Sequence, residues 1–117
     1  MGDSVQIRRM RPEDAEKLKG CFERCYGSSY VVDTFYDPDR LRAVMAASRL
    51  ISVVAETSAG DIVGHMGLTV RDADALTVDA GNTVVDPDYR GQNIVGRLGL
   101  RLTDLCAELC FFFFMIR

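Results

Sequence analysis

The spacing of apolar residues divides the chain into strands and helices in a mixed order. Alternation over residues 5–10 predicts a first strand, and apolar residues three and four positions apart predict a helix that starts at Pro12. The Asp37-Pro38 pair predicts a second, shorter helix, because it supplies an N-cap and a proline for the first helical turn. Residues 31–36, between the two helices, fit either a strand or a loop.

Three more apolar runs predict an antiparallel meander in the middle of the chain. Residues 50–57 and 62–70 are rich in strand-forming side chains, and the turn-forming residues 58–61 separate them. Residues 76–85 supply the third strand of the meander. The predicted order is therefore a strand, two helices, three antiparallel strands and a further helix.

The stretch from Thr83 to Leu109 is predicted to be a strand, a tight turn and a long helix. Val84 and Val85 suit a strand, and Gly91 lets the backbone turn tightly or approach a ligand closely. Apolar residues then recur three and four positions apart and form one helical stripe, made of Val95, Leu98, Leu102, Leu105 and Leu109.

The start of this helix has the features of a phosphate-binding site. The first amides of a helix have no intrahelical partner, and the helix dipole adds partial positive charge there. Arg90 adds a full positive charge just before the helix, and Arg97 follows one turn into it. The same residues also fit an ordinary strand–turn–helix with solvated arginines, and these features alone do not separate the two interpretations.

Residues 84–98, Val-Val-Asp-Pro-Asp-Tyr-Arg-Gly-Gln-Asn-Ile-Val-Gly-Arg-Leu, resemble the acetyl-CoA-binding segment of GNAT-type N-acetyltransferases. In that superfamily a strand ends in Val-x-Pro-x-x-Arg-Gly, and a loop with the pattern Arg/Gln-x-x-Gly-x-Gly/Ala holds the CoA pyrophosphate with its amides. Arg90 and Gly91 match this pattern. Asn93 and Val95 replace the usual glycines, which leaves the backbone donors in place because every residue except proline provides an N–H.

A second match lies near the other end of the chain, where Arg-Pro-Glu-Asp at 11–14 follows the first strand. This resembles the GNAT N-terminus, and the predicted element order is that of the GNAT fold. The resemblance covers nearly the whole chain in topology but only residues 8–14 and 84–98 in motif. It implies one α/β (α+β) domain over residues 1–117, with a central, mostly antiparallel sheet flanked by helices.

The resemblance also implies a function, namely transfer of an acetyl group from acetyl-CoA, as co-substrate, to an amine of a small-molecule acceptor. The backbone at 83–85 would pair with the pantetheine arm like an added strand, and the amides from 92 to 96 would bind the pyrophosphate. The cofactor-binding residues predicted in this way are Thr83, Val84, Val85, Arg90, Gly91, Gln92, Asn93, Ile94, Val95 and Gly96.

Acyl transfer to an amine needs a general base, and in this superfamily a Glu or Asp on the strand before the loop often serves. Asp79 occupies about that position, and the alternative is a solvated strand residue. The segment between the first two helices commonly lines the acceptor side. Tyr30, Phe35 and Tyr36 are therefore candidate acceptor contacts, with the alternative that they cover the edge of the core.

Composition limits the other classes of function. The formal net charge of −3 gives no electrostatic reason to expect nucleic-acid binding. The sequence shows no secretory signal and no apolar stretch long enough to span a membrane. Four cysteines without a signal favour reduced thiols in the cytoplasm.

The cysteines and the one histidine are the remaining candidates for chemistry. Cysteines four apart at 21 and 25, and at 106 and 110, could bind zinc, but helical cysteines are commonly small core residues and no metal site is predicted. His65 is expected to be a buried, hydrogen-bonded imidazole rather than a base, on the same strand face as Val63, Gly67 and Thr69.

Residues 110–117 form an apolar run with four consecutive phenylalanines. They fit a buried strand, and the helix and hairpin that usually follow in GNAT proteins are not in the sequence. We therefore expect poor solubility or a homodimer through residues 111–116, or a missing C-terminal segment that pairs there. The alternatives to an enzyme are a non-catalytic CoA-binding or interaction module and a fragment of a larger protein.

Overall fold

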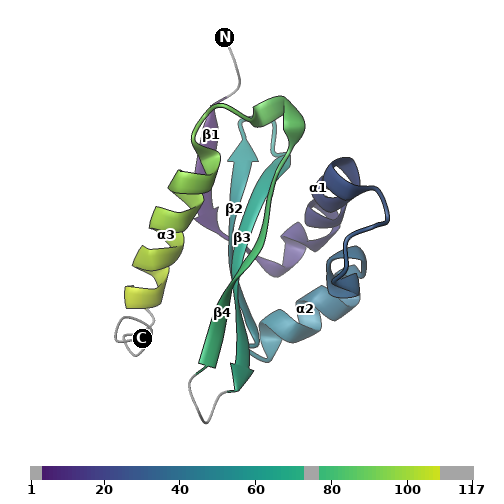
Figure 1. Ribbon diagram of the computed structural model, residues 1–117, viewed down its shortest axis with the longest axis vertical. Coiled ribbons are helices and arrows are strands. Elements are labelled where there is room, and N and C mark those ends of the chain that lie inside the picture. The colour runs from purple at the N-terminus through teal and green to yellow at the C-terminus, as the bar shows by residue number, and fades with distance from the viewer. Residues whose placement is uncertain (1–3, 73–76, 109–117) are drawn as a thin grey trace.

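An antiparallel sheet forms the centre of the computed structural model, which describes residues 4–72 and 77–108 (Figure 1). The four strands are hydrogen-bonded in chain order, β1-β2-β3-β4. The strands are β1 (Val5–Arg9), β2 (Leu50–Thr57), β3 (Ile62–Asp72) and β4 (Thr77–Val85). The helices are α1 (Ala15–Tyr26), α2 (Pro38–Ala46) and α3 (Ile94–Glu108), and short 3-10 turns are η1 (Pro12–Asp14), η2 (Asp33–Tyr36) and η3 (Pro87–Tyr89). The predicted fold class is confirmed.

Helices cover both faces of the sheet, with α1 and α2 on one side and α3 on the other (Figure 1). Leu50 and Val54 of β2 pack toward α1 and α2, whereas Ile51, Val53 and Ala55 pack toward α3. This strand is apolar at nearly every position because both of its faces are buried. Each helix buries one stripe, which for α3 consists of Ile94, Leu98, Leu102, Leu105 and Cys106.

The start of α1 is fixed by the carboxylate of Asp14. Arg8 of β1 donates from Nη1 and Nη2 to Asp14 at 2.8 and 2.9 Å, and the backbone amide of Arg11 donates at 2.7 Å. The guanidinium of Arg8 also donates from Nε to Glu56 of β2 at 2.9 Å. The Arg-Pro-Glu-Asp motif therefore joins the helix to two strands.

Three register shifts interrupt the strand pairing of the meander, and two of them bear on the predictions and on the site. In β3, Gly64 pairs with Ala55 but Ile62 pairs with Glu56, so Val63 is an extra residue. The prediction that Val63 and His65 share a face is wrong, because this bulge turns Val63 toward α3 while the imidazole packs toward α1.

The second bulge lies in β4, at residues 82 and 83. His65 pairs with Val84 and Gly67 pairs with Gly81, so one residue of β3 faces two of β4. Asn82 takes the left-handed backbone conformation there, with φ +53°. The residues of this bulge line the two clefts described below.

Three sequence-based predictions remain to be placed. The segment at 31–36 is largely the 3-10 turn η2 rather than a strand. The Phe-rich segment 110–117, with the dimer prediction for 111–116, lies outside the described residues. No described helix is both long enough and apolar enough to cross a bilayer.

Candidate functional site

A cleft of about 350 Å³ opens where β4 leads into α3. It contains all the predicted cofactor-binding residues except Gln92 and Gly96. Its walls come from the end of β4, the loop after it, the start of α3 and one side of α1. The lining residues are Cys25, Tyr26, Thr83, Val84, Val85, Tyr89, Arg90, Gly91, Asn93, Ile94 and Val95. We call this hollow the cofactor cleft, after the predicted cofactor-binding residues that line it.

The loop into α3 turns through two left-handed residues, Gly91 with φ +91° and Asn93 with φ +55°. Asn93 acts as the N-cap, because its carbonyl accepts a hydrogen bond from the amide of Arg97 at 3.1 Å. The amides of the first turn of α3 have no carbonyl of the same helix to bind. The helix therefore starts at the cleft with the positive end of its dipole.

Gly96 packs against the side chain of Asn93 and does not line the cleft. A Cβ atom added at this position would lie 2.6 Å from Oδ1 of Asn93, which is closer than real Cβ contacts. Glycine occurs here, one position late in the GNAT pattern, because the side chain of the N-cap fills the space.

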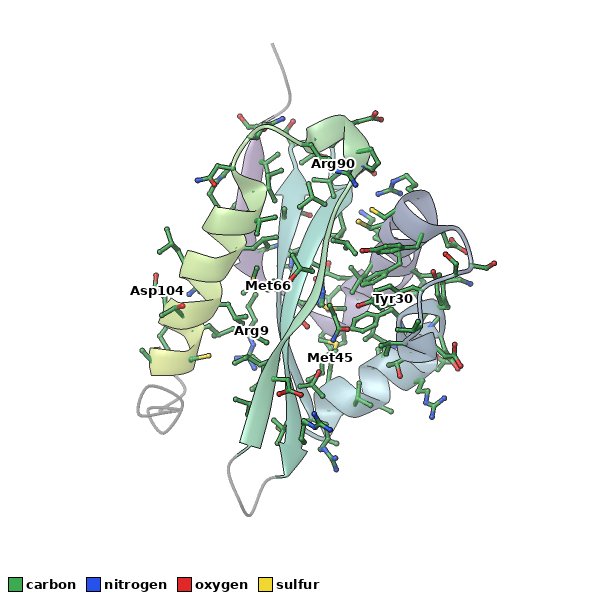
Figure 2. All side chains as sticks on the ribbon, in the orientation of Figure 1. Arg9, Tyr30, Met45, Met66, Arg90 and Asp104 are labelled. Carbon is green, nitrogen blue, oxygen red and sulfur yellow. The ribbon has the colours of Figure 1, made fainter. Side chains whose placement is uncertain are left out.

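The two arginines of this segment point to different places. Arg90 is exposed and lies beside the loop at the end of β4 (Figure 2). The side chain of Arg97 donates from Nη2 to the carbonyl of Val5 at 2.5 Å and so joins α3 to β1. Of the two arginines, only Arg90 lines the cofactor cleft.

One wall of the cofactor cleft is α1, which was not predicted. Cys25 and Tyr26 line it, and the thiol of Cys25 lies 3.6 Å from the carbonyl oxygen of Val85. Burial raises the pKa of the Cys25 thiol, so this group is a protonated donor rather than a nucleophile. The local pattern showed only a helical core stripe, and nothing in it indicated that α1 crosses beside the end of β4.

A second cleft, of about 280 Å³, lies on the α2 side of the sheet. Its lining is mostly apolar, and its polar residues are Thr34, Arg49, Thr69 and Asn82. The lining residues are Val32, Thr34, Phe35, Val44, Arg49, Leu50, Thr69, Val70 and Asn82. Asn82 lines this cleft and the next residue of β4, Thr83, lines the cofactor cleft. We call this point of the β4 bulge, where consecutive residues line the two clefts, the junction.

The predicted acceptor contacts lie around this junction. Phe35 is only 2% exposed, stacks on Phe22 at 4.5 Å between ring centroids, and lines the second cleft. The hydroxyl of Tyr30, which points toward β4 in Figure 2, donates to Oδ1 of Asn82 at 2.8 Å. The hydroxyl of Tyr36 accepts from the amide of Tyr30 at 3.1 Å. Their role toward an acceptor stays a prediction.

His65 is buried in the sheet beneath the same bulge, as expected. Its Nδ1 lies 2.7 Å from the carbonyl oxygen of Asn82, and its Nε2 lies 2.8 Å from Oγ of Ser52. A carbonyl can only accept, so Nδ1 carries the proton and Nε2 accepts from the serine hydroxyl. Burial lowers the pKa of His65 to about 4, against the opposing effect of the Asn82 carbonyl, so the ring is neutral at pH 7.

The predicted base, Asp79, lies farther back along β4. Its carboxylate pairs with Arg71 at 2.9 Å, and its side chain is 56% exposed. It lines a shallow hollow that also includes Asn82, but it lines neither cleft. The structure does not bring it against the cofactor cleft, and its catalytic role stays a prediction.

Cys21 and Cys106 lie in the two cores on opposite faces of the sheet. They therefore cannot share a metal ion. Burial raises the pKa of Cys21 to about 12, as expected for an inert core thiol.

No protein-family model matches the sequence, and no curated protein matches it. Solved structures do match the fold. A GNAT family N-acetyltransferase of Escherichia coli in complex with CoA has a TM-score of 0.70 at 21% identity, over 93% of this chain and 59% of that one. A GNAT family acetyltransferase of Brucella melitensis in complex with acetyl-CoA has a TM-score of 0.67 at 25% identity, over 92% of this chain and 71% of that one.

A GNAT family acetyltransferase of Staphylococcus aureus has a TM-score of 0.69 at 20% identity, over 92% of this chain and 69% of that one. The resemblance indicated by the two motifs is thus confirmed at the level of the fold. The chain spans only 59% of the length of the Escherichia coli protein.

Proposed function

We propose that this chain, which has the fold of the GNAT N-acetyltransferases, binds acetyl-CoA in the cofactor cleft and transfers the acetyl group to an amine in the second cleft. The observation that carries the proposal is that two consecutive residues of β4, Asn82 and Thr83, line the two clefts. A group-transfer enzyme needs such a point, where an acceptor in one site can reach the reactive atom of a donor in the other.

The cofactor cleft has a suitable place for each part of CoA. The pyrophosphate would bind at the first amides of α3, with Arg90 adding a positive charge. The pantetheine arm would lie along Thr83 to Val85, because β4 is an edge strand and no other described strand pairs with its outer side. This path brings the thioester to the bulge at Asn82.

The transfer itself forms a C–N bond and breaks the C–S bond of the thioester. A neutral amine attacks the carbonyl, its proton goes to a base, and the departing CoA thiolate takes up a proton. We propose that Asp79, the one carboxylate of β4, receives the amine proton through water in the hollow that it shares with Asn82.

The lining of the second cleft supports an acceptor with an apolar part. Val32, Phe35, Val44 and Leu50 supply apolar walls, and Arg49 supplies a positive charge that is in no ion pair among the described residues. A small amine that also carries an apolar group and a carboxylate would complement both features.

The first test is thermal unfolding with and without acetyl-CoA, followed by calorimetry. A ligand that binds only the folded state at about a hundred times its Kd adds about 2.7 kcal/mol of stability. Arg90→Glu should leave the unliganded melting temperature unchanged and weaken binding at least about tenfold, because a charge-assisted contact becomes repulsive. Arg40→Glu, at an exposed position of α2, is the matched control and should bind normally. Binding by neither wild type nor control would overturn the proposal.

The ion pair of Asp79 with Arg71, outside both clefts, also supports a second candidate, a CoA-binding module without turnover. Release of the CoA thiol from acetyl-CoA in the presence of a panel of small amines separates the two. Turnover that Asp79→Asn abolishes, with acetyl-CoA affinity unchanged, would establish the enzyme. Tight binding without thiol release across the panel would favour the module.

A further inference from the structure

We infer that His65 is a positioning residue, which fixes the backbone of Asn82 at the junction of the two clefts and so sets the place of the cofactor's acetyl group. This inference rests on the proposed function. His65 lines neither cleft, and it acts only through the carbonyl of Asn82.

The backbone at Asn82 needs such support. A β-bulge breaks the ladder between β3 and β4 at this residue, and its φ of +53° is uncommon for a residue other than glycine. Asparagine tolerates the left-handed region better than most residues, but a conformation of this kind persists only where the surroundings fix it.

His65 is well placed to fix it from inside the sheet. Its two ring nitrogens are hydrogen-bonded to Asn82 and Ser52. The ring therefore can neither rotate nor move its proton from Nδ1 to Nε2 without losing a buried hydrogen bond. Phe22 and Phe35 pack edge-on against the imidazole at centroid distances of 6.0 and 5.2 Å. The donor that reaches the Asn82 carbonyl therefore has one position.

Tyr30 holds the same residue through its side chain. Its hydroxyl donates to the side-chain oxygen of Asn82, while the imidazole donates to the main-chain oxygen. The ring of Tyr30 is itself held against Phe22, at 4.8 Å between centroids. The peptide at the junction is thus held through two independent hydrogen bonds from two side chains.

The consequence concerns the acetyl group rather than the rest of the cofactor. The pyrophosphate would bind at the start of α3, away from the bulge, whereas the thioester would lie against residues 82 and 83. Loss of the His65 donor should therefore reduce the preference for acetyl-CoA over CoA and leave the affinity for CoA itself nearly unchanged. A purely structural defect would weaken both ligands alike.

Two variants separate the ring nitrogens of His65. In His65→Asn the side-chain nitrogen takes the place of Nδ1 and can still donate a hydrogen bond to Asn82. In His65→Gln the side-chain nitrogen takes the place of Nε2, so this variant keeps the hydrogen bond to Ser52 and loses the one to Asn82. Ser52→Ala is the matched control, because it removes the Nε2 partner and leaves the Nδ1 bond. Dissociation constants for CoA and acetyl-CoA are measured by calorimetry at a temperature where every variant is folded.

We expect acetyl-CoA to bind about fivefold more tightly than CoA to three of the proteins, namely the wild type, His65→Asn and Ser52→Ala. One net hydrogen bond gives a ratio of this size. His65→Gln should bind both ligands equally. A ratio in His65→Gln that equals the wild-type ratio, or no preference in the wild type, would overturn the inference.

A readout without ligand keeps this test separate from the proposed function. The amide chemical shifts of residues 81–84 should move in His65→Gln and stay close to wild type in Ser52→Ala. If the wild type binds neither ligand, the proposed function fails, and the amide shifts still decide whether His65 holds the bulge. Unchanged shifts in His65→Gln would overturn the inference whatever the ligands do.

Discussion

Arg24 of α1 donates a hydrogen bond from Nε to Oδ2 of Asp86 at 2.6 Å, and this contact joins the helical wall of the cofactor cleft to the loop that follows β4. The second oxygen of Asp86 accepts from the amide of Asp88 at 3.0 Å and caps η3. Arg24 also donates to the carbonyl of Ile62 at 2.8 Å. One buried carboxylate therefore fixes the loop after β4 against α1.

We predict that Asp86→Ala lowers the free energy of unfolding by about 2 kcal/mol, from the lost cap and the lost partner of a half-exposed arginine. Asp86→Asn keeps an acceptor for the cap and should lose about half as much. Urea unfolding of both variants measures the difference. Equal losses would mean that the cap contributes nothing and that the ion pair alone matters.

A second prediction concerns Asn93 and Gly96 at the start of α3. Gly96→Ala should cost about 1 kcal/mol of stability in the wild type, because the new Cβ would meet Oδ1 of Asn93 and the N-cap side chain must move. In an Asn93→Gly background that obstacle is gone, and the same change should be neutral or stabilising by about 0.5 kcal/mol. Urea unfolding of the wild type, the two single variants and the double variant gives the coupling free energy between the two positions. Additive effects would show that the two side-chain positions do not interact.

The element order was predictable because it depends on local signals. The Asp37-Pro38 pair starts α2 as expected, and the three apolar runs form the meander in chain order. The two GNAT-like motifs also have local causes, since Asp14 pairs with Arg8 only six residues away and the turn before α3 needs a left-handed residue at Gly91.

The site was only partly predictable because it depends on contacts between distant segments. The places of Cys25 and Tyr26 in the cofactor cleft follow from how α1 crosses the sheet, which no spacing rule encodes. The misplacement of Val63 followed from a bulge, which adds a residue without changing the alternating pattern. Asn82 gave no signal, because an asparagine near a glycine in a strand also fits an ordinary turn.

A third prediction uses the backbone of Asn82. Asn82→Gly should keep the left-handed conformation and lose only the side-chain bond to Tyr30, so its stability should fall by about 1 kcal/mol or less. Asn82→Ala loses the same bond and in addition strains a Cβ in the left-handed region, which costs about 1 kcal/mol more. The difference between the free energies of unfolding of the glycine and alanine variants, measured by chemical denaturation, gives the cost of the left-handed backbone at this residue. An alanine variant as stable as the glycine variant would mean that the bulge relaxes to another conformation.

The last prediction is the pH dependence that His65 imposes on stability. The pKa of its imidazole is lowered by burial from 6.5 to about 4 in the folded chain. Between these values the unfolded state binds more protons, so the free energy of unfolding should fall as the pH falls from 6.5 toward 4, by about 3 kcal/mol in all. Above pH 6.5 this contribution is complete and constant.

Asp14 affects the free energy of unfolding at a lower pH than His65 does, and it provides the internal comparison. Burial alone would raise its pKa, but hydrogen bonds from Arg8 and from the Arg11 amide lower it below 3.8, so its contribution is present above that value and lost in stronger acid. Urea unfolding from pH 7.5 to 3 should therefore show a decline that begins below pH 6.5 in the wild type. In His65→Gln the decline should begin only near pH 4, where carboxylates start to protonate. The same decline from pH 6.5 in both proteins would show that His65 is not the group responsible.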